Sequence, residues 1–214
     1  MEEVWRDKKW LESYIDIEGD RAQNRFETTI NIESVLNLIP KNAETLLDYG
    51  CCGGFFTQLC TKQVPGVFGY DISEYAREIA ADNASDAKII TKNEMDDMKF
   101  GVVILKLVIH FVEDLDDLVK YLKKILDDKG TVIVSTAHPM KIVLDAGVSY
   151  GGGSALYEDD VSNTKKSVTM VYRSIEDNVK PFLENGFVVD ALEEIFDENR
   201  SDIPKRLNIR YRLV

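Results

Sequence analysis

The sequence predicts an α/β domain with a doubly wound, mostly parallel sheet. Short apolar runs alternate with amphipathic helical patterns along most of the chain. The run 101–108, GVVILKLV, is almost continuously apolar, which is typical of a central parallel strand covered on both faces. A glycine-rich turn at 50–54 separates the first predicted strand from a helix, and ligands of such sheets bind at turns of this kind.

Length and charge limit the classes of protein to consider. The 214 residues suit one domain, 1–214. A net charge of −12 argues against a nucleic-acid partner, because phosphate binding requires lysine and arginine. No apolar run approaches the roughly 20 residues of a membrane span, and the N-terminus lacks the apolar core of a signal peptide. We therefore expect a cytoplasmic protein without a membrane partner; the oligomeric state stays open.

The elements can be predicted in chain order. Helical spacing at 4–15 and 30–39 predicts two helices before the first strand. The strands are expected at 45–49, 66–71, 87–91, 101–108, 131–136, 187–195 and 206–214, with helices beginning near residues 55, 73, 115 and 174. Gly130 is expected to end the helix that begins near residue 115. The last strand follows a short connection, so we expect it to pair antiparallel.

Two stretches interrupt the alternation of strands and helices. Residues 93–99 are polar and are expected to form a loop. Residues 138–166 contain Pro139 and three consecutive glycines, and we expect a long irregular insert, which in compact domains often serves as a lid. Together with an N-terminal helical lid at 1–30, this insert is predicted to cover the substrate.

Two acids give the glycine turn its chemistry. Asp48 ends the strand before the turn, where a carboxylate would repel a pyrophosphate and attract a cation. The dinucleotide pattern G-x-G-x-x-G is absent. Asp71 ends the next strand and offers two oxygens to a pair of ribose hydroxyls; the alternative is an acid that only caps the following helix. S-adenosylmethionine, with an ammonium, a sulfonium and a ribose, suits both acids.

The order of four motifs carries a resemblance to a known family. The segments LLDYGCCGG, VFGYDISEYAREIA, FGVVILKLVIHFVED and SIEDNVKPFLENGF resemble the successive motifs of class I S-adenosylmethionine-dependent methyltransferases of the small-molecule type, in the UbiE-like or type 11 group. The resemblance implies a Rossmann-like fold with a seven-stranded sheet, an antiparallel last strand and S-adenosyl-L-methionine as cofactor. Cys52 departs from the pattern, because the family usually has glycine there.

The resemblance and the strand ends together assign a cofactor site. Its expected residues are Asp48, Gly50, Cys51, Gly54, Asp71, Ile72, Asn93, Glu94 and Lys106. Asn93 or Glu94 is expected to contact adenine. Lys106 interrupts an apolar strand near the methyl donor, and the alternative is a lysine whose head reaches solvent. No metal site is expected, because the cysteines Cys51, Cys52 and Cys60 lack further ligands at metal spacing.

The acceptor side of the site is predicted from the strand ends. His110 follows the fourth strand and His138 the fifth, so both are expected at the ligand-binding rim as candidate catalytic bases. A structural role is the alternative for each histidine. Aromatic residues are expected to form the walls around the acceptor, and the candidates are Tyr14, Phe111, Tyr150 and Tyr172.

Three functions remain open at this stage. The first is methyl transfer to nitrogen or oxygen of a small-molecule metabolite, which would be the partner. The second is a catalytically inactive protein that binds S-adenosylmethionine and acts through a partner, a reading that Cys52 favours. The third is a nucleotide-dependent oxidoreductase, against which the missing G-x-G-x-x-G pattern counts.

Overall fold

The computed structural model describes residues 7–9, 11–12, 15, 26–150, 153–159, 166–197 and 200–214. Its strands are β1 (Thr45–Tyr49), β2 (Gly66–Tyr70), β3 (Lys88–Ile89), β4 (Phe100–Lys106), β5 (Leu126–Ala137), β6 (Gly153–Asp159), β7 (Lys166–Tyr172), β8 (Phe187–Asp197) and β9 (Arg200–Leu213). Its helices are α3 (Phe26–Asn37), α4 (Phe55–Cys60), α5 (Glu74–Asn83), α6 (Lys92–Asp96), α7 (Leu115–Ile125), α8 (Pro139–Ala146) and α9 (Ile175–Glu184), with a 3₁₀ turn η1 (Ile109–Phe111).

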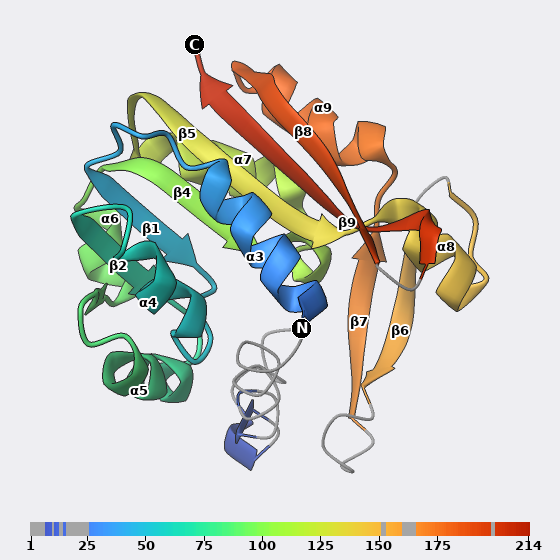
Figure 1. The fold of residues 1–214 in the computed structure, drawn as a ribbon, viewed down its shortest axis with the longest axis horizontal. Coiled ribbons are helices and arrows are strands. Elements are labelled where there is room, and N and C mark those ends of the chain that lie inside the picture. Colours follow the sequence, from blue (N-terminus) through green and yellow to red (C-terminus); the bar gives the residue numbers. More distant parts are fainter. Residues whose placement is uncertain are drawn as a thin grey trace.

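Seven strands form one sheet in the order β3-β2-β1-β4-β5-β9-β8 (Figure 1). The pairs among β3, β2, β1, β4 and β5 are parallel, whereas β9 runs antiparallel to both β5 and β8. The predicted fold class and the antiparallel last strand are therefore confirmed. The parallel order places the carboxyl ends of β1, β2 and β4 at one edge, where the glycine turn begins.

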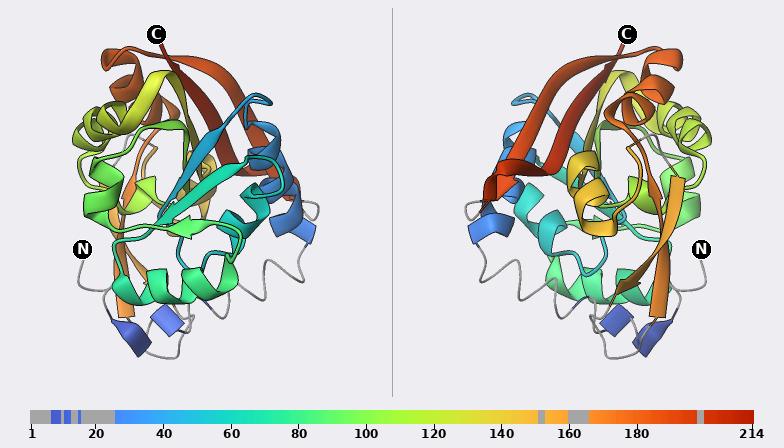
Figure 2. Two further views of the ribbon diagram at one scale, coloured as in Figure 1. Left: turned by 90° about the vertical axis from the view of Figure 1, so that its left-hand side faces the viewer. Right: turned by 90° about the vertical axis from the view of Figure 1, so that its right-hand side faces the viewer.

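Helices cover both faces of the sheet, as the side views in Figure 2 show. On one face, α3 and α4 pack over a core that includes Val35, Leu46, Phe56 and Ile104. On the other face, α7 and α9 pack over a larger core. The central strands owe their apolar composition to this double cover: Val103, Ile104 and Leu105 of β4 are all fully buried. Among the described residues, no helix has both the length and the apolar character of a membrane span.

The structure corrects the prediction for the insert 138–166. This segment is not irregular where it is described: it contains α8 and β6, and β6 pairs antiparallel with β7 in a separate two-stranded sheet. The hairpin extends toward the end of the molecule where α5 lies (Figure 1). His138 is the N-cap of α8: its ring accepts a hydrogen bond from the Met140 amide, and Pro139 lies in the first turn of the helix.

Two further boundaries differ from the predictions. Residues 93–99 are not all loop, because α6 occupies Lys92–Asp96 with a complete capping box between Thr91 and Glu94. The helix α7 ends at Ile125 rather than at Gly130, and β5 starts directly at Leu126. A bulge explains the early start: Phe100 pairs with Leu126 while Val102 pairs with Thr131, so β5 contains extra residues there.

Candidate functional site

The glycine loop is tied to the end of β2. The amides of Gly50 and Cys51 both donate to the carbonyl of Tyr70, over 2.7 and 2.9 Å. Gly50 has a φ of 86°, and a Cβ at this position would lie 2.5 Å from Cγ2 of Val108. Two features therefore require glycine at position 50: the positive backbone angle and the close approach of the segment after β4.

Cys52 joins the loop to Asp71 through its backbone. Its amide donates to Oδ2 of Asp71 over 3.0 Å, and its φ of 47° orients the amide toward that carboxylate. The side chain packs in a small apolar cluster around Leu11 and Ile15 that also contains Phe55 and Phe111. Cys52 thus replaces the family's usual glycine but keeps a left-handed backbone conformation, which is the conformation that favours glycine at this position.

Asp71 is fixed in place by two amides. Besides the Cys52 contact, Oδ1 accepts from the amide of Ser73 over 2.9 Å, and Ser73 also caps α5. Each carboxylate oxygen has two lone pairs and can accept more than one hydrogen bond. Ile72 beside it exposes 40% of its surface, an apolar wall next to an acceptor pair. This geometry fits a ribose.

Asp48 is buried at the end of β1. Only 2% of its surface is exposed, and Oδ2 accepts from the hydroxyl of Thr57 in α4 over 2.7 Å. Burial, with the charge of Asp48 as a second cause, raises the pKa of the neighbouring Cys60 thiol, while Lys106 acts in the opposite direction. Sequence reasoning missed Thr57, because no local pattern distinguishes it from other helical threonines.

The residues expected at adenine lie in α6. The carboxylate of Glu94 accepts from the amide of Thr91 over 2.9 Å and pairs with Lys88 at 3.1 Å. The amide hydrogen bond, followed by that lysine, lowers the pKa of Glu94 to about 2. Asn93 is exposed on the same helix. Glu94 therefore has a structural task, and the T-x-x-E spacing in the sequence is the signal for it.

His110 is buried in η1, next to β5. Its Nδ1 lies 3.3 Å from the hydroxyl of Thr136, and its ring lies 4.1 Å from that of Phe111. Burial, helped by the charges of Arg206 and Arg173, lowers its pKa to about 3, so the ring is neutral at pH 7. Arg173 holds η1 in place by donating to the carbonyls of Ile109, Val112 and Glu113, a long-range contact that the sequence pattern does not reveal.

Both nitrogens of His138 have partners. Nδ1 accepts from the Met140 amide over 3.1 Å, so the proton of the neutral ring lies on Nε2, which is 2.8 Å from Oε1 of Glu194 in β8. Burial lowers the pKa of His138, and Glu194 partly offsets this. The contacts place this histidine at the start of α8, where it caps the helix and links it to β8.

The aromatic candidates occupy different positions. Phe111 belongs to the apolar cluster with Leu11 and Ile15. Tyr172, at the end of β7, is 8% exposed, and its burial raises the pKa of its hydroxyl. Tyr150 is 42% exposed, and its hydroxyl accepts a hydrogen bond from the Ile175 amide. Tyr14 lies outside the described residues.

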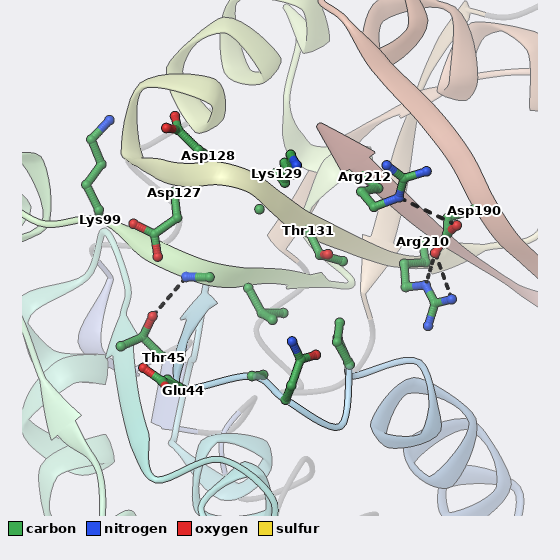
Figure 3. A pocket seen from close by; sticks show the side chains of 16 residues that line it. Glu44, Thr45, Lys99, Asp127, Asp128, Lys129, Thr131, Asp190, Arg210 and Arg212 are labelled. Atoms are coloured by element: carbon green, nitrogen blue, oxygen red, sulfur yellow. Dashed lines mark hydrogen bonds and ion pairs between the residues drawn. The ribbon is translucent and has the colours of Figure 1, made fainter. Parts of the chain in front are cut away.

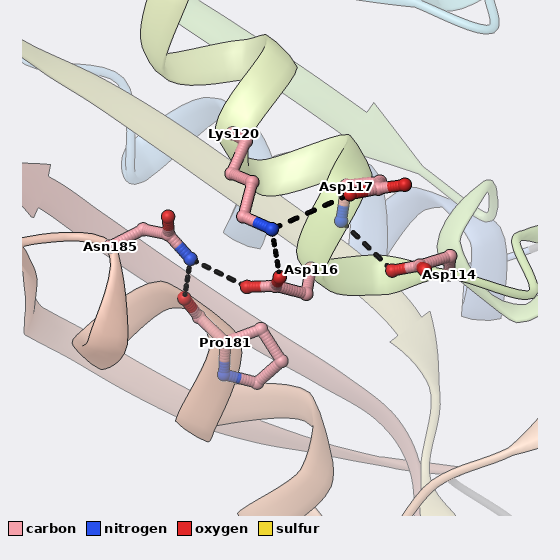
Figure 4. A network of polar contacts seen from close by, with 6 residues as sticks. All are labelled: Asp114, Asp116, Asp117, Lys120, Pro181 and Asn185. Carbon is pink, nitrogen blue, oxygen red and sulfur yellow. Dashed lines mark hydrogen bonds and ion pairs between the residues drawn. The ribbon is translucent and has the colours of Figure 1, made fainter.

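A cluster of acidic residues on the molecular surface can be explained without a ligand. Asp114, Asp116 and Asp117 cluster at the start of α7, but Asp114 caps the helix and Asp116 binds Lys120 and Asn185 at 2.6 and 2.8 Å (Figure 4). This is a capping and ion-pair network on a helix surface.

A groove of about 770 Å³ lies at the amino ends of the strands, far from the glycine loop in the fold. Figure 3 shows that both acidic and basic side chains line the groove, and Asp190 pairs with Arg210 at 2.7 Å. Ligands of open α/β sheets bind at the opposite, carboxyl end. The groove is therefore separate from the candidate site.

Comparisons with known proteins agree with this geometry. A family model described as a methyltransferase domain matches residues 47–134, which span β1 to β5. A ubiquinone biosynthesis O-methyltransferase from Pelagibacter ubique is 30% identical over 98 residues, 42% of this chain and 41% of that protein. The match thus spans less than half of the relative's length.

Solved structures extend the likeness to the whole fold. A candidate S-adenosylmethionine-dependent methyltransferase from Listeria monocytogenes has a TM-score of 0.71 at 18% identity, covering 86% of this chain and 98% of its own. The N-methyltransferase NodS from Bradyrhizobium japonicum, solved with S-adenosyl-L-homocysteine, has a TM-score of 0.66 at 13% identity, covering 90% of each chain. At these identities the likeness shows the fold alone.

The predicted family and its cofactor, S-adenosyl-L-methionine, are confirmed by these matches. The acids at the ends of β1 and β2 and the glycine loop between them suit that cofactor. Residues 47–134 thus match a methyltransferase domain, and the chain as a whole has the fold of the S-adenosylmethionine-dependent methyltransferases to which it is similar.

Proposed function

We propose that the chain transfers a methyl group from S-adenosylmethionine to nitrogen or oxygen of a small-molecule metabolite. The main support is the arrangement of Asp48 and Asp71 on either side of the glycine loop, each fixed by hydrogen bonds before any ligand binds. Such preorganisation lowers the entropy cost of binding. The cofactor supplies an electrophilic methyl group on a sulfonium, which the acceptor's lone pair takes while the C–S bonding electrons stay on sulfur.

In this proposal the protein mainly binds and aligns. Asp71 accepts the ribose hydroxyls, and the glycine loop lets the cofactor approach the main chain. Phe111, Tyr150 and Tyr172 form walls for the acceptor, and residues 1–30 and the segment 138–166 exclude water. Asn93 can still meet the adenine edge from α6, whereas Glu94 supports that helix.

The histidines favour nitrogen over oxygen as the acceptor atom. A group with a pKa of about 3, as for His110, is a weak base at pH 7. A neutral amine needs no base before it attacks, whereas a phenol or alcohol does. His110 then accepts a hydrogen bond from the amine rather than removing its proton first, and His138 acts as a structural cap.

A panel of amines and phenols with S-adenosylmethionine tests the proposal, with S-adenosylhomocysteine formation as the readout. We expect turnover with at least one acceptor and its loss in Asp71→Ala. Calorimetry should show that this variant also binds S-adenosylhomocysteine at least about tenfold more weakly, because two hydrogen bonds to a charged group are lost. Wild-type protein that binds neither form of the cofactor would refute the proposal.

The weak basicity of His110 also supports a second candidate, a protein that binds the cofactor and acts through a partner without catalysis. It predicts tight cofactor binding with no turnover of any acceptor in the panel. Methylation of one acceptor that is reduced in His110→Ala but not in Lys99→Met, a substitution at the other end of β4, would exclude it.

A further inference from the structure

The segment that follows β4 contains a strained residue. The strand ends at Lys106, whose Nζ lies 5.5 Å from the centroid of the Phe56 ring, and Leu107 follows with a φ of 59°. This left-handed conformation is unfavourable for any residue with a Cβ. Such strain persists only where the surrounding structure enforces it, and it is most common at functional sites. Residues 107–113 must therefore be held by contacts from other elements.

Contacts at both ends hold this segment. At its start, the Leu107 amide donates to the carbonyl of Ser135 in β5 over 2.7 Å. At its other end, the guanidinium of Arg173 donates to the carbonyls of three residues, which are Ile109 at 2.9 Å, Val112, and Glu113 at 3.0 Å. A planar guanidinium with five N–H donors can hold several carbonyls at fixed positions. The position of η1, between the two anchors, therefore depends on Arg173.

Arg173 is itself anchored to two other elements. It directly follows β7, whose last residue pairs with Gly153 at the base of the β6–β7 hairpin. Its carbonyl and that of Ser174 accept hydrogen bonds from Nδ2 of Asn178 in α9, over 3.4 and 2.9 Å. Asn178 is buried, and its own carbonyl accepts from the Tyr211 hydroxyl over 3.1 Å. Arg173 thus joins the base of the hairpin, the helix α9 and the segment after β4.

The segment carries two of the residues expected at the acceptor. The Nδ1 of His110 lies 3.3 Å from the Thr136 hydroxyl, and the His110 ring lies 4.1 Å from the Phe111 ring. Burial is the main cause of the low pKa of His110, and the charges of Arg206 and Arg173 add to it, so both guanidinium groups lie near the imidazole. A displacement of η1 would move both rings, and a misplacement of about 1 Å can slow a reaction about 100-fold.

We propose that Arg173 is a positioning residue for methyl transfer, which holds His110 and Phe111 at the acceptor by fixing residues 107–113 to the base of the β6–β7 hairpin. It acts through these two rings rather than on a reactant. The inference rests on the proposed function in one respect, the place of the acceptor next to His110. It also accounts for the strain at Leu107, because a segment held at both ends cannot relax this backbone angle without moving η1.

NMR of the histidine rings tests the positioning without any acceptor. The chain has two histidines, so ¹⁵N-histidine labelling gives one set of ring signals for His110 and one for His138, assigned with His110→Gln and His138→Gln. At neutral pH we expect Arg173→Met to shift or broaden the His110 signals and to leave those of His138 in place. A role of Arg173 in stability alone would leave both sets at their wild-type positions in the folded protein, and this result would overturn the inference.

Kinetics with an acceptor from the amine panel separate positioning from cofactor binding. Arg173→Met should lower kcat about 10- to 100-fold and change the affinity for S-adenosylhomocysteine less than about threefold. The affinity is spared because the Leu107 amide still holds the end of the segment that approaches Gly50. An unchanged kcat, or equal losses in kcat and affinity, would overturn the inference. Wild-type protein that methylates no acceptor would instead refute the proposed function, and the histidine signals would still test Arg173.

Arg210→Met is the matched control for removal of a partly buried arginine. Arg210 also donates to a backbone carbonyl, that of Leu38, over 3.1 Å, but it lines the groove at the amino ends of the strands. This variant should lose stability, as Arg173→Met does, without a change in the His110 signals or in kcat. Equal changes of both in the two variants would show that a general loss of stability is the cause, and the inference would fail.

Arg173→Lys keeps the test decisive if Arg173→Met does not fold. The lysine keeps the positive charge, but a single ammonium cannot hold three carbonyls in the geometry of the planar guanidinium. The His110 signals should therefore still shift, and kcat should still fall by at least about threefold. Wild-type signals together with a wild-type kcat in Arg173→Lys would overturn the inference.

Discussion

Cys52 has a left-handed backbone, with a φ of 47°. This conformation costs a non-glycine residue roughly 1–2 kcal/mol, whereas glycine avoids the clash but has a more flexible unfolded state. We therefore expect Cys52→Gly to raise the free energy of unfolding by about 1 kcal/mol or less, a rise in Tm of at most about 4 °C. Urea and thermal unfolding measure both quantities.

Cys52→Ala is the control for that change, because alanine keeps the steric cost while removing the thiol. It should not be more stable than the wild type, since the thiol packs against the cluster around Leu11 and Ile15. An equal gain in the alanine and glycine variants would mean that the side chain, not the backbone angle, causes the strain.

His110 makes stability depend on pH. Burial lowers its pKa to about 3 in the folded chain, against about 6.5 when unfolded, so the unfolded state binds the proton more readily as the pH falls. The contribution of the neutral His110 ring to the free energy of unfolding is present above pH 6.5 and is lost as the pH falls from 6.5 to 3. Relative to His110→Gln, the wild type should lose about 2 kcal/mol between pH 7.5 and pH 5. Urea unfolding at both pH values tests this, and a constant difference would contradict it.

At the scale of elements, Gly50 shows how the turn after β1 depends on its neighbour after β4. An alanine there would meet Val108 at 2.5 Å as well as the cost of a φ of 86°. We expect Gly50→Ala to destabilise the protein by about 2–4 kcal/mol and to abolish cofactor binding. The matched control is Gly147→Ala, with a φ of 64° but nothing within 4 Å of a Cβ, which should cost only about 1 kcal/mol. An equal loss of stability in the two variants would contradict a steric role for Val108.

The sequence predicted the elements more reliably than their boundaries. The apolar strands β1 and β4 were recognisable because both faces are buried, and this burial is a composition signal. The insert was misread because β6 begins within the glycine run, at Gly153, and pairs with the strand that follows it rather than joining the main sheet. The start of β5 was misplaced because a bulge with Lys129 at a φ of 62° adds residues that the partner strand lacks.

The predicted strand ends indicated where the candidate site lies, but they did not indicate which side chains its residues contact. Asp48, Asp71 and His110 lie at the carboxyl edge because parallel strands end together there, which a linear pattern can predict. Their contacts with Thr57, Ser73 and Thr136 depend on how side chains meet after folding. Burial then decides that His110 is neutral, and no sequence spacing carries that information.

At the scale of the whole molecule, the described N-terminal residues pack on the site rather than on the sheet core. Leu11 and Ile15 are 1% and 5% exposed, and Ile15 lies 2.8 Å from the place of a Cβ on Gly53. Their neighbours Cys52 and Phe111 belong to the loops around the cofactor site. We therefore expect this segment to open separately from the core, as local unfolding units do, and to close the site when it is docked.

The variant Leu11→Ala tests whether the N-terminal segment opens separately from the core. The control is Leu46→Ala, which changes an equally buried leucine in β1. Either substitution removes about 2–4 kcal/mol of local packing. In Leu46→Ala this loss should appear in the global free energy of unfolding. In Leu11→Ala it should instead favour the open segment: global stability changes little, trypsin cuts faster after Lys8 and Lys9, and S-adenosylhomocysteine binds more weakly. If both variants lost the same global stability with no change in proteolysis, the segment would be part of the core, and its role as a lid would be excluded.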